Sequence, residues 1–395
     1  MLRESSVFEV LRHAEVIPRG KSPEYRRRAR WSRVSSRRAR VGSRTAIIGW
    51  ILLLATSVCN AADSGSGPFA VSIVPSDDPV LATPGGRTEP LTTQQIEAMV
   101  RRAVDLVGGM ATVVPDTARL VVLKANIGAR PNTVGVVTDA RVVRAVALLV
   151  HEVAPEARIY IGEGSGSWIS PDLVGTVPVS LHFTIDEDHR RRMYDGFAAA
   201  GYRAVERELQ ERGIDIRCYD LNFDRAIFST APGGGSAARQ YAIAASILEA
   251  DVWINIPVAK THGAKITAAM KNMFGLLPGH IYGWNKGRGT DVMDGIPHAP
   301  RIVDESFVDL MLITEPDFVV TDLIRGSEGG AFSDTYHRSN IIIAGRDPIA
   351  ADLVAAKLMG YNPDDLEFAE LAARRGRGPG TYAHIDLLGA AVEPL

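Results

Sequence analysis

Lysines, a histidine and an asparagine follow a short apolar run in the middle of the chain. The run from Asp251 to Pro257 has the length and composition of a strand buried on both faces of a parallel sheet. Lys260, His262, Lys271 and Asn272 come soon after it, next to glycines. Cationic and hydrogen-bonding groups at the end of a buried strand are suited to holding a carboxylate or a phosphate. The spacing therefore predicts an anion site that also transfers protons.

Three of these residues are the predicted catalytic groups. His262 is the candidate proton carrier because imidazole titrates near neutral pH, and Lys260 is a candidate base if burial lowers its pKa. A helix predicted to begin near Thr267 would place Thr267 and Lys271 on one face and add its positive N-terminal end to the site. The alternative for any one lysine is a surface salt bridge.

Other predicted strands carry polar residues to the same edge. The strand at 119–125 ends in Lys124 and is followed by Asn126, and the strand at 157–162 is followed by Glu163. The helix between them, capped by Thr138 with Asp139 behind it, makes a right-handed β-α-β unit with parallel strands. The carboxyl ends of parallel strands meet at one edge, so these side chains are expected to converge with the lysine cluster.

Two C-terminal strands are expected to add to this edge. The strand at 317–321 ends at Asp322, and the strand at 340–344 is followed by Arg346 and Asp347. Asp347 precedes Pro348, a pattern typical of a helix N-cap, which favours a capping role over a catalytic one. The predicted ligand-binding set is Lys124, Asn126, Glu163, Asn255, Asn272 and Asp322.

Cofactor signals are weak. Ligands for a divalent metal could come from Glu163, Asp322 and three histidines, His262, His280 and His298, but no His-x-x-x-His spacing supports a site, and no metal ligand is assigned. The acidic pair Asp186 to Asp188 lies away from these residues in the chain. Only Cys59 and Cys218 are present, which excludes a Cys₄ zinc site and a four-cysteine iron–sulfur cluster.

Two enzyme motifs are missing. The glycine-rich stretch from Gly162 to Trp168 lacks the G-x-G-x-x-G spacing and has Pro171 where a helix should begin, so it is interpreted as a turn or a small-anion loop. Glu163 within it is a candidate base or metal ligand, with a solvated carboxylate as the alternative. No G-x-S-x-G elbow of a serine hydrolase occurs.

The predicted organisation has three parts. Residues 1–62 hold 13 Lys/Arg against 4 Asp/Glu, and a basic stretch precedes the apolar run Ala46 to Val58 and small residues, which predicts an export signal. Ser36 to Val41 partly resembles a twin-arginine signal, and an uncleaved anchor is the alternative. Residues 63–92 are a predicted linker with one short strand, and 93–395 a single α/β domain with a mostly parallel open sheet flanked by helices. We expect an exported, periplasmic protein.

The net charge of the chain disfavours some classes of binding partner. Beyond residue 62 the chain carries 31 Lys/Arg against 42 Asp/Glu, a net charge of about −11, which disfavours nonspecific binding to nucleic acid or to an anionic membrane. Membrane contact is expected only through the export signal, and the sequence does not indicate the oligomeric state.

The remaining segments alternate between predicted helices and strands. Helices are predicted at 94–107, 243–250, 301–312, 348–359 and 366–373, with Gly360 as a C-cap. The charge-rich stretch to Gly213 indicates one or two helices, and strands are predicted at 214–220 and 226–230. The Gly/Pro-rich segment 281–300, which carries Lys286, is typical of a mobile loop over a site.

The segments VVLKANIG, IYIGEGSG, ADVWINIPVAKTHG, TAAMKNMFGLLPG and AGRDPIAADLVAAKLMG together resemble the domain of unknown function 362 family. The resemblance spans roughly Leu120 to Gly360, and its most specific marks are Lys260 to His262 and Lys271 to Gly275. The resemblance implies an α/β fold and points to the same lysine and histidine residues as the functional site. Some relatives carry ferredoxin-like cysteine clusters, which this chain lacks, and Ala125 and Ala259 stand where relatives often have Pro and Leu.

Three functions follow as hypotheses. The leading one is an enzyme that acts by acid–base or Lewis-acid chemistry on a small anionic substrate, a carboxylate or a phosphate. The second is a noncatalytic periplasmic binding protein for an anionic metabolite, and the third is a redox protein with a non-covalent cofactor. Turnover separates the first two hypotheses, and bound flavin or metal would identify the third.

Overall fold

The computed structural model describes residues 67–78, 91–128, 133–164, 195–263, 265–283, 286–287, 289, 293–297, 299 and 301–390. These residues belong to one compact unit. The predicted export signal, residues 165–168 of the glycine-rich stretch, Asp186 to Asp188 and His298 lie outside the described residues. In the described part of the chain, no helix combines the length and the apolar character that a membrane span requires.

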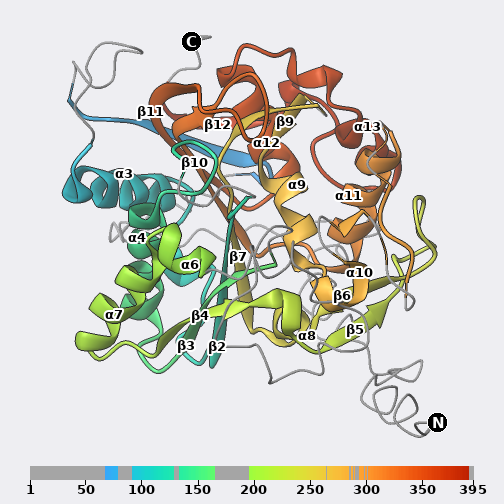
Figure 1. Cartoon of the computed structure of the whole chain (residues 1–395). Helices are drawn as coiled ribbons and strands as arrows, with labels where there is room; N and C mark the ends of the chain where they lie inside the picture. Colours follow the sequence, from blue (N-terminus) through green and yellow to red (C-terminus); the bar gives the residue numbers. More distant parts are fainter. Residues whose placement is uncertain are drawn as a thin grey trace, which may run out of the picture. The chain divides into compact units, whose positions relative to one another are not determined.

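An eight-stranded mixed sheet forms the centre of this unit and confirms the α/β fold class (Figure 1). Five neighbouring strands, β10, β7, β2, β3 and β4, run parallel. In spatial order the strands are β12 (Asp386–Gly389), β1 (Ala70–Pro75), β11 (Tyr336–Gly345), β10 (Phe318–Ser327), β7 (Val252–Ile256), β2 (Leu120–Ala125), β3 (Arg158–Glu163) and β4 (Ile216–Asp220). The strand expected within the predicted linker is β1, and it pairs with both β11 and β12.

The direction of β11 corrects one prediction. β11 pairs antiparallel with β10, and Gly345 at its end lies opposite Val319 near the start of β10. Arg346 and Asp347 therefore lie at the edge of the sheet opposite to the ends of the parallel strands. Arg346 donates to the carbonyl of Thr112 at 3.1 Å. An apolar run does not encode strand direction, so the sequence could not reveal this reversal.

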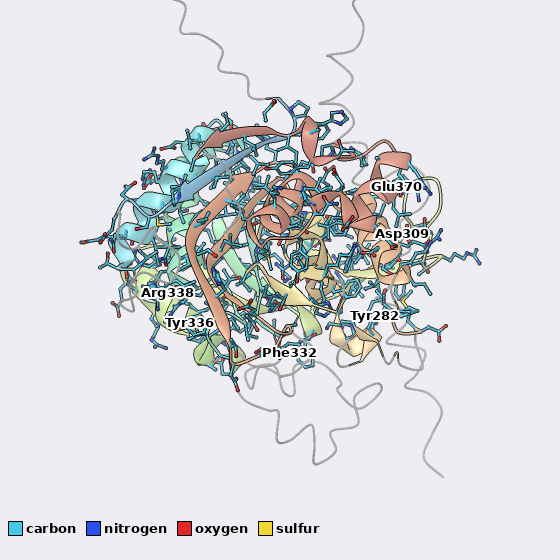
Figure 2. All side chains as sticks on the ribbon, turned by 90° about the horizontal axis from the view of Figure 1, so that it is seen from above. Tyr282, Asp309, Phe332, Tyr336, Arg338 and Glu370 are labelled. Carbon is cyan, nitrogen blue, oxygen red and sulfur yellow. The ribbon has the colours of Figure 1, made fainter. Side chains whose placement is uncertain are left out.

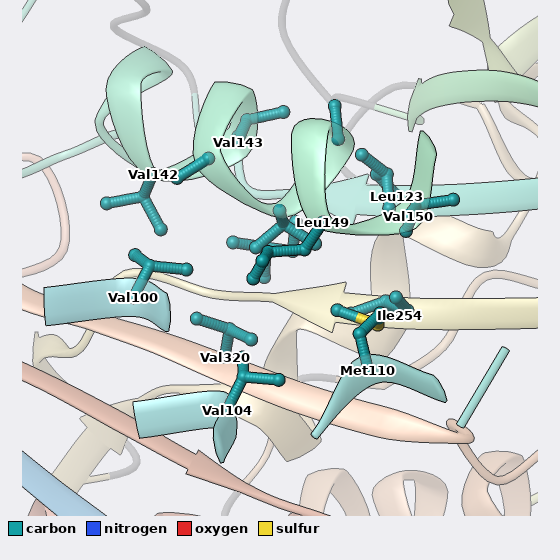
Figure 3. Close-up of a cluster of buried hydrophobic side chains, with 14 of the residues drawn as sticks. Val100, Val104, Met110, Leu123, Val142, Val143, Leu149, Val150, Ile254 and Val320 are labelled. Atoms are coloured by element: carbon teal, nitrogen blue, oxygen red, sulfur yellow. The ribbon is translucent and has the colours of Figure 1, made fainter. Parts of the chain in front are cut away.

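Helices cover both faces of the sheet. The helices α3 (Thr93–Leu106), α4 (Ala140–Val153), α6 (Gly196–Ala199) and α7 (Tyr202–Glu211) pack on one face, and Figure 3 shows part of the apolar core between α3, α4 and the strands. The helices on the other face are α8 (Ala245–Glu249), α9 (Ala269–Asn272), α10 (Gly279–Tyr282), α11 (Ile302–Ile313), α12 (Pro348–Leu358) and α13 (Glu367–Arg374).

Helix starts follow the capping rules, with one correction. Asp139, not Thr138, is the N-cap of α4, and its carboxylate accepts from the amide of Arg141. The hydroxyl of Thr138 instead donates to the carbonyl of Ile256 at 2.7 Å and accepts from the amide of Asn126 at 3.1 Å, which ties β2 to β7. Asp347 caps α12 as predicted, accepting from the amide of Ala350 at 2.7 Å.

Two predicted helices are partly strand. Tyr241–Ala244 forms β6, which pairs with β5 (Ala226–Ser229), so the helix predicted over 243–250 begins only at Ala245. Lys260–His262 forms β8, which makes a short hairpin with β9 (Lys265–Thr267). Thr267 is therefore a strand residue, and the helix predicted to begin there is the four-residue α9. After α12, Gly360 has a φ of 81°, as the predicted glycine C-cap requires.

Candidate functional site

Three asparagines and Lys124 form a network at the carboxyl edge of the sheet. Lys124 of β2 and Asn255 of β7 are register partners on neighbouring parallel strands, so their side chains lie on the same face, the one that α9 covers. Asn272 lies at the end of α9, and its side-chain Nδ2 donates to Asn255 Oδ1 at 2.8 Å. Asn272 Oδ1 accepts from Lys124 Nζ at 3.0 Å and from Asn126 Nδ2 at 3.1 Å. The register of two strands thus positions the network.

Lys124 is a buried cation with a full set of acceptors. Its Nζ lies 2.9 Å from Glu163 Oε1, 2.7 Å from the carbonyl of Ala125 and 3.0 Å from Asn272 Oδ1. Three acceptors match the three hydrogens of an ammonium group. Burial lowers the pKa of Lys124, and the neighbouring Glu163 carboxylate acts against this shift.

Glu163 is held by the backbone as well as by Lys124. Its Oε2 accepts from the amide of Ile127 at 2.7 Å, and its Oε1 accepts from the amide of Gly164 at 2.8 Å. Gly275 passes so close that a Cβ there would lie 2.1 Å from Glu163 Oε1 and 2.5 Å from Lys124 Nζ. The chain after α9 therefore closes over the ion pair, and only glycine fits at that position.

Lys260 is also buried, but its partners are neutral. It is 2% exposed, and its Nζ donates to Asn126 Oδ1 at 2.9 Å and to the carbonyl of Val136. Burial, reinforced by the charges of Lys271 and Lys124 against the opposing effect of Glu163, lowers the pKa of Lys260 to about 7. At neutral pH a large fraction of Lys260 is therefore a neutral amine.

Lys271 is the more exposed lysine of the group. It lies in α9 with a half-buried side chain, and its Nζ is 5.8 Å from the centre of the Phe274 ring. Burial lowers its pKa to about 8, and the Glu163 carboxylate opposes this shift. Lys271 therefore keeps most of its positive charge at neutral pH and can meet an anion that arrives from solvent.

Lys286 belongs to the same charged group, and the predicted site did not include it. It is 3% exposed, and its Nζ donates to Oδ1 of Asn222. Asn222 lies two residues beyond the end of β4. Burial lowers its pKa to about 7, against the carboxylates of Asp220 and Glu163, and the nearby charge of Lys124 lowers it further. The sequence did predict that the Gly/Pro-rich segment that carries Lys286 lies over a site, and this was the feature from which Lys286 could have been included.

His280 also contacts the Asn222 backbone. Its Nδ1 lies 2.8 Å from the carbonyl oxygen of Asn222. Because a carbonyl only accepts, this contact assigns a hydrogen to Nδ1. His262, the predicted proton carrier, is the last residue of β8 and pairs with Lys265 across the hairpin. It has a half-buried side chain, and its catalytic role stays a prediction.

The structure does not bring Asp322 to the lysines. Asp322 lies inside β10 and its side chain faces α4, where it accepts from the amides of Asp139 at 2.8 Å and Ile324 at 2.9 Å. Arg325 lies 3.4 Å from the Asp139 carboxylate. Burial and the charge of Asp139 raise the pKa of Asp322. The predicted convergence is wrong for this residue, because strand alternation sends Asp322 to the opposite face from Lys124.

The positive end of α9 is not available to a ligand. The two carboxylate oxygens of Asp352 in α12 accept from the amides of Ala269 at 2.6 Å and Met270 at 2.9 Å. An internal carboxylate therefore occupies the place that the sequence had suggested for a substrate anion. Asp352 instead fixes the helix that carries Lys271 and Asn272.

The described residues do not include a cluster of side chains that could bind a metal ion. Among the described residues, no three His, Cys, Asp or Glu side chains gather as a metal site would require. The described charged groups at this edge are the four lysines Lys124, Lys260, Lys271 and Lys286, with Glu163 and, beside Lys286, Asp220. The lysines outnumber the carboxylates. Such a group favours an anionic ligand.

Comparison with known proteins identifies the family. Residues 121–357 match the model described as "Domain of unknown function (DUF362)", and the chain belongs to this family. A thylakoid-associated protein from Synechocystis sp. is 28% identical over 135 residues, which cover 33% of this chain and 40% of that protein. The lactate racemase apoprotein from Thermoanaerobacterium thermosaccharolyticum aligns with a TM-score of 0.32 and 13% identity, over 57% of this chain and 48% of that one.

Proposed function

We propose that the protein is an enzyme that binds a small anionic substrate at the lysine cluster and uses the neutral amine of Lys260 as a general base. The observation that carries this proposal is a difference between two buried lysines near Glu163: one forms an ion pair with this carboxylate and the other does not. Glu163 pairs with Lys124, while Lys260 has only the neutral acceptors Asn126 and Val136 among the described residues. Lysine is an effective base at neutral pH only when its pKa is lowered in this way.

The other two lysines supply the positive charge for binding. Lys271 and Lys286 approach Glu163 closely enough to interact with it electrostatically, and they come from separate segments of the chain. A carboxylate or phosphate among these ammonium groups would raise their pKa values and hold them charged, since an opposite charge favours the ionised form. The anion would then stand beside the amine of Lys260.

Binding and chemistry need separate measurements. Binding of inorganic phosphate and of acetate is measured by calorimetry at pH 6.5, where Lys271 and a large fraction of Lys286 are charged. Proton transfer is measured as exchange of carbon-bound hydrogen in D₂O, by NMR, over a panel of short oxo-, hydroxy- and unsubstituted carboxylates. We expect Lys260→Met to abolish exchange while anion binding stays measurable, weakened by the loss of the charge that Lys260 carries at this pH. Lys271→Met should weaken binding about tenfold, the loss of one charge-assisted contact.

The noncatalytic alternative has its own signature. If the wild-type protein binds anions and exchanges no carbon-bound hydrogen in the panel above the rate without protein, it is a binding protein. If it binds neither phosphate nor any carboxylate, the anion site itself is wrong. Lys265→Met is the matched control, because Lys265 lies in the same hairpin and is exposed. This variant should behave as wild type in both assays.

A further inference from the structure

The hydrogen-bond pattern of Lys260 defines where its lone pair points. A neutral primary amine has two hydrogens and one lone pair. The two acceptors described for Lys260 Nζ, Asn126 Oδ1 and the Val136 carbonyl, can take both hydrogens. The lone pair is then directed away from both acceptors. Lys124, by contrast, has three acceptors and no direction left for a lone pair.

Space beside Lys260 Nζ is kept by a glycine. A Cβ on Gly128 would lie 3.7 Å from Nζ, and 3.1 Å from the ring of Phe332. Gly128 is partly exposed, and Phe332, labelled in Figure 2, is 46% exposed. Lys260 itself is buried, so a small reactant would have to reach its amine past this glycine, and substitution of Gly128 tests that path.

We propose that Lys260 is a nucleophile that forms an imine with the carbonyl carbon of a small 2-oxo carboxylate. This inference rests on the anion site and the neutral amine of the proposed function, names the substrate class, and gives the amine of Lys260 a covalent role in place of the general-base role. Lys271, whose positive charge acts on Lys260, would bind the carboxylate of such a molecule, and the carbonyl carbon is bonded directly to that carboxylate. A desolvated lysine next to another cation is the arrangement that activates an amine for imine formation.

The step balances without a further reactant. The lone pair of Nζ attacks the carbonyl carbon, and the π electrons move to oxygen to give a carbinolamine. Loss of that oxygen with the two amine hydrogens as water leaves a neutral C=N bond, which takes a proton from solvent to become an iminium ion. The iminium withdraws electrons and makes the hydrogens on the next carbon more acidic, which agrees with proton exchange as the readout.

Borohydride trapping with pyruvate as the probe tests the assignment. Sodium borohydride reduces an imine to a stable secondary amine, which intact-mass and peptide mass spectrometry then locate. At pH 7, Lys260 offers about a thousand times more neutral amine than an exposed lysine with an ordinary pKa. We therefore expect one adduct per chain, on Lys260, at pyruvate concentrations that leave the exposed Lys265 unmodified.

Two variants separate this role from a structural one. Lys260→Met should lose the adduct, and Lys265→Met should keep it at the wild-type level. Lys260→Met must also give the circular dichroism spectrum of the wild type, which shows that the variant is folded. An adduct on Lys271 or Lys286, or no adduct above that of a lysine-containing peptide, overturns the inference.

Failure of the inference differs from failure of the proposed function. If Lys260-dependent hydrogen exchange occurs and no adduct forms, Lys260 is a base and not a nucleophile. If neither exchange nor anion binding occurs, the proposed function fails and the imine with it. A Lys260 adduct without exchange would keep the nucleophile and remove the general-base role.

Discussion

Lys124 and Lys260 are both buried at the same edge of the sheet, and they differ in what surrounds their amino groups. Lys124 has a carboxylate at 2.9 Å and two further acceptors, whereas Lys260 has an amide oxygen and a backbone carbonyl. Asn126 and Asn272 connect the two groups through hydrogen bonds. The first lysine is therefore suited to stay charged and fixed, and the second to exchange a proton.

This difference suggests a division of work within one network. Glu163 forms its ion pair with Lys124 and not with Lys260, so burial and the neighbouring cations outweigh the opposing effect of Glu163 on the pKa of Lys260. A buried ion pair contributes little net stability, yet it can fix the position of its neighbours. We infer that Lys124 is a positioning residue that makes the amine of Lys260 reactive.

The largest expected effect comes from breaking the ion pair. Lys124→Met leaves the Glu163 carboxylate buried without a cation at hydrogen-bonding distance, which should lower the free energy of unfolding by about 3–5 kcal/mol. Urea denaturation monitored by tryptophan fluorescence measures it. The double variant with Glu163→Gln should cost less than the two single changes together, since the uncompensated charge is gone. A loss below about 1 kcal/mol for Lys124→Met would contradict the assignment of Lys124 as an ion-paired lysine.

The second effect is a pH slope in stability. The pKa of Lys260 is about 7 in the folded protein against 10.5 for an ordinary lysine, so between these values the unfolded chain binds one more proton than the folded one. Wild-type stability must then rise with pH in that window, by up to about 1.4 kcal/mol per pH unit from this group.

Lys260→Met removes that slope and keeps those of Lys271 and Lys286. The difference in unfolding free energy, wild type minus variant, should therefore increase from pH 7 to pH 9.5 and stay flat from pH 5 to pH 6.5. Urea denaturation at several pH values measures this difference. A difference that is flat over the whole range would mean that Lys260 has an ordinary pKa in the folded protein.

The sequence allowed the parallel part of the fold and much of the site to be predicted. Lys124, Asn126, Glu163 and Asn255 follow or end buried strands, and parallel strands carry such residues to one edge. Asn272 joins them in the same network. These residues could be found because their positions depend on local strand patterns.

Other parts depend on tertiary contacts that leave no local pattern. Lys286 reaches the cluster from a segment without helical or strand periodicity. The sequence predicted that the N-terminus of α9 could bind a ligand, but the carboxylate of Asp352, more than eighty residues later in the chain, accepts hydrogen bonds from its amides. Asp322 was placed in the site because its strand was predicted to end there, although β10 continues to Ser327 and alternation turns Asp322 to the other face.

Removing the neighbouring cation should change Lys260 without touching it. Lys271→Met deletes a positive charge that lowers the pKa of Lys260, so this pKa should rise by about half to one unit. The pH midpoint of borohydride trapping with pyruvate reports this shift. Lys271→Arg keeps the charge and should keep the midpoint near the wild-type value. An unchanged midpoint in Lys271→Met would show that burial alone sets the pKa.

The smallest effect tests the space beside the amine. Gly128→Ala places a methyl group 3.7 Å from Lys260 Nζ, 3.1 Å from the exposed Phe332 ring, which has room to shift, and 3.2 Å from Cγ1 of the buried Val136, which has less. We expect the free energy of unfolding to fall by about 1 kcal/mol, and trapping by pyruvate to slow several-fold because the methyl group narrows the path to the amine.

Gly263→Ala is the matched control for this change. Gly263 follows β8 directly, and a Cβ there would meet nothing within 4 Å. Its trapping rate should equal that of wild type. If Gly128→Ala also traps at the wild-type rate, with its fold intact by circular dichroism, the carbonyl compound must approach Lys260 from a side other than Gly128. The path past Gly128 would then be wrong, while the difference in charge pairing between Lys124 and Lys260 would stand.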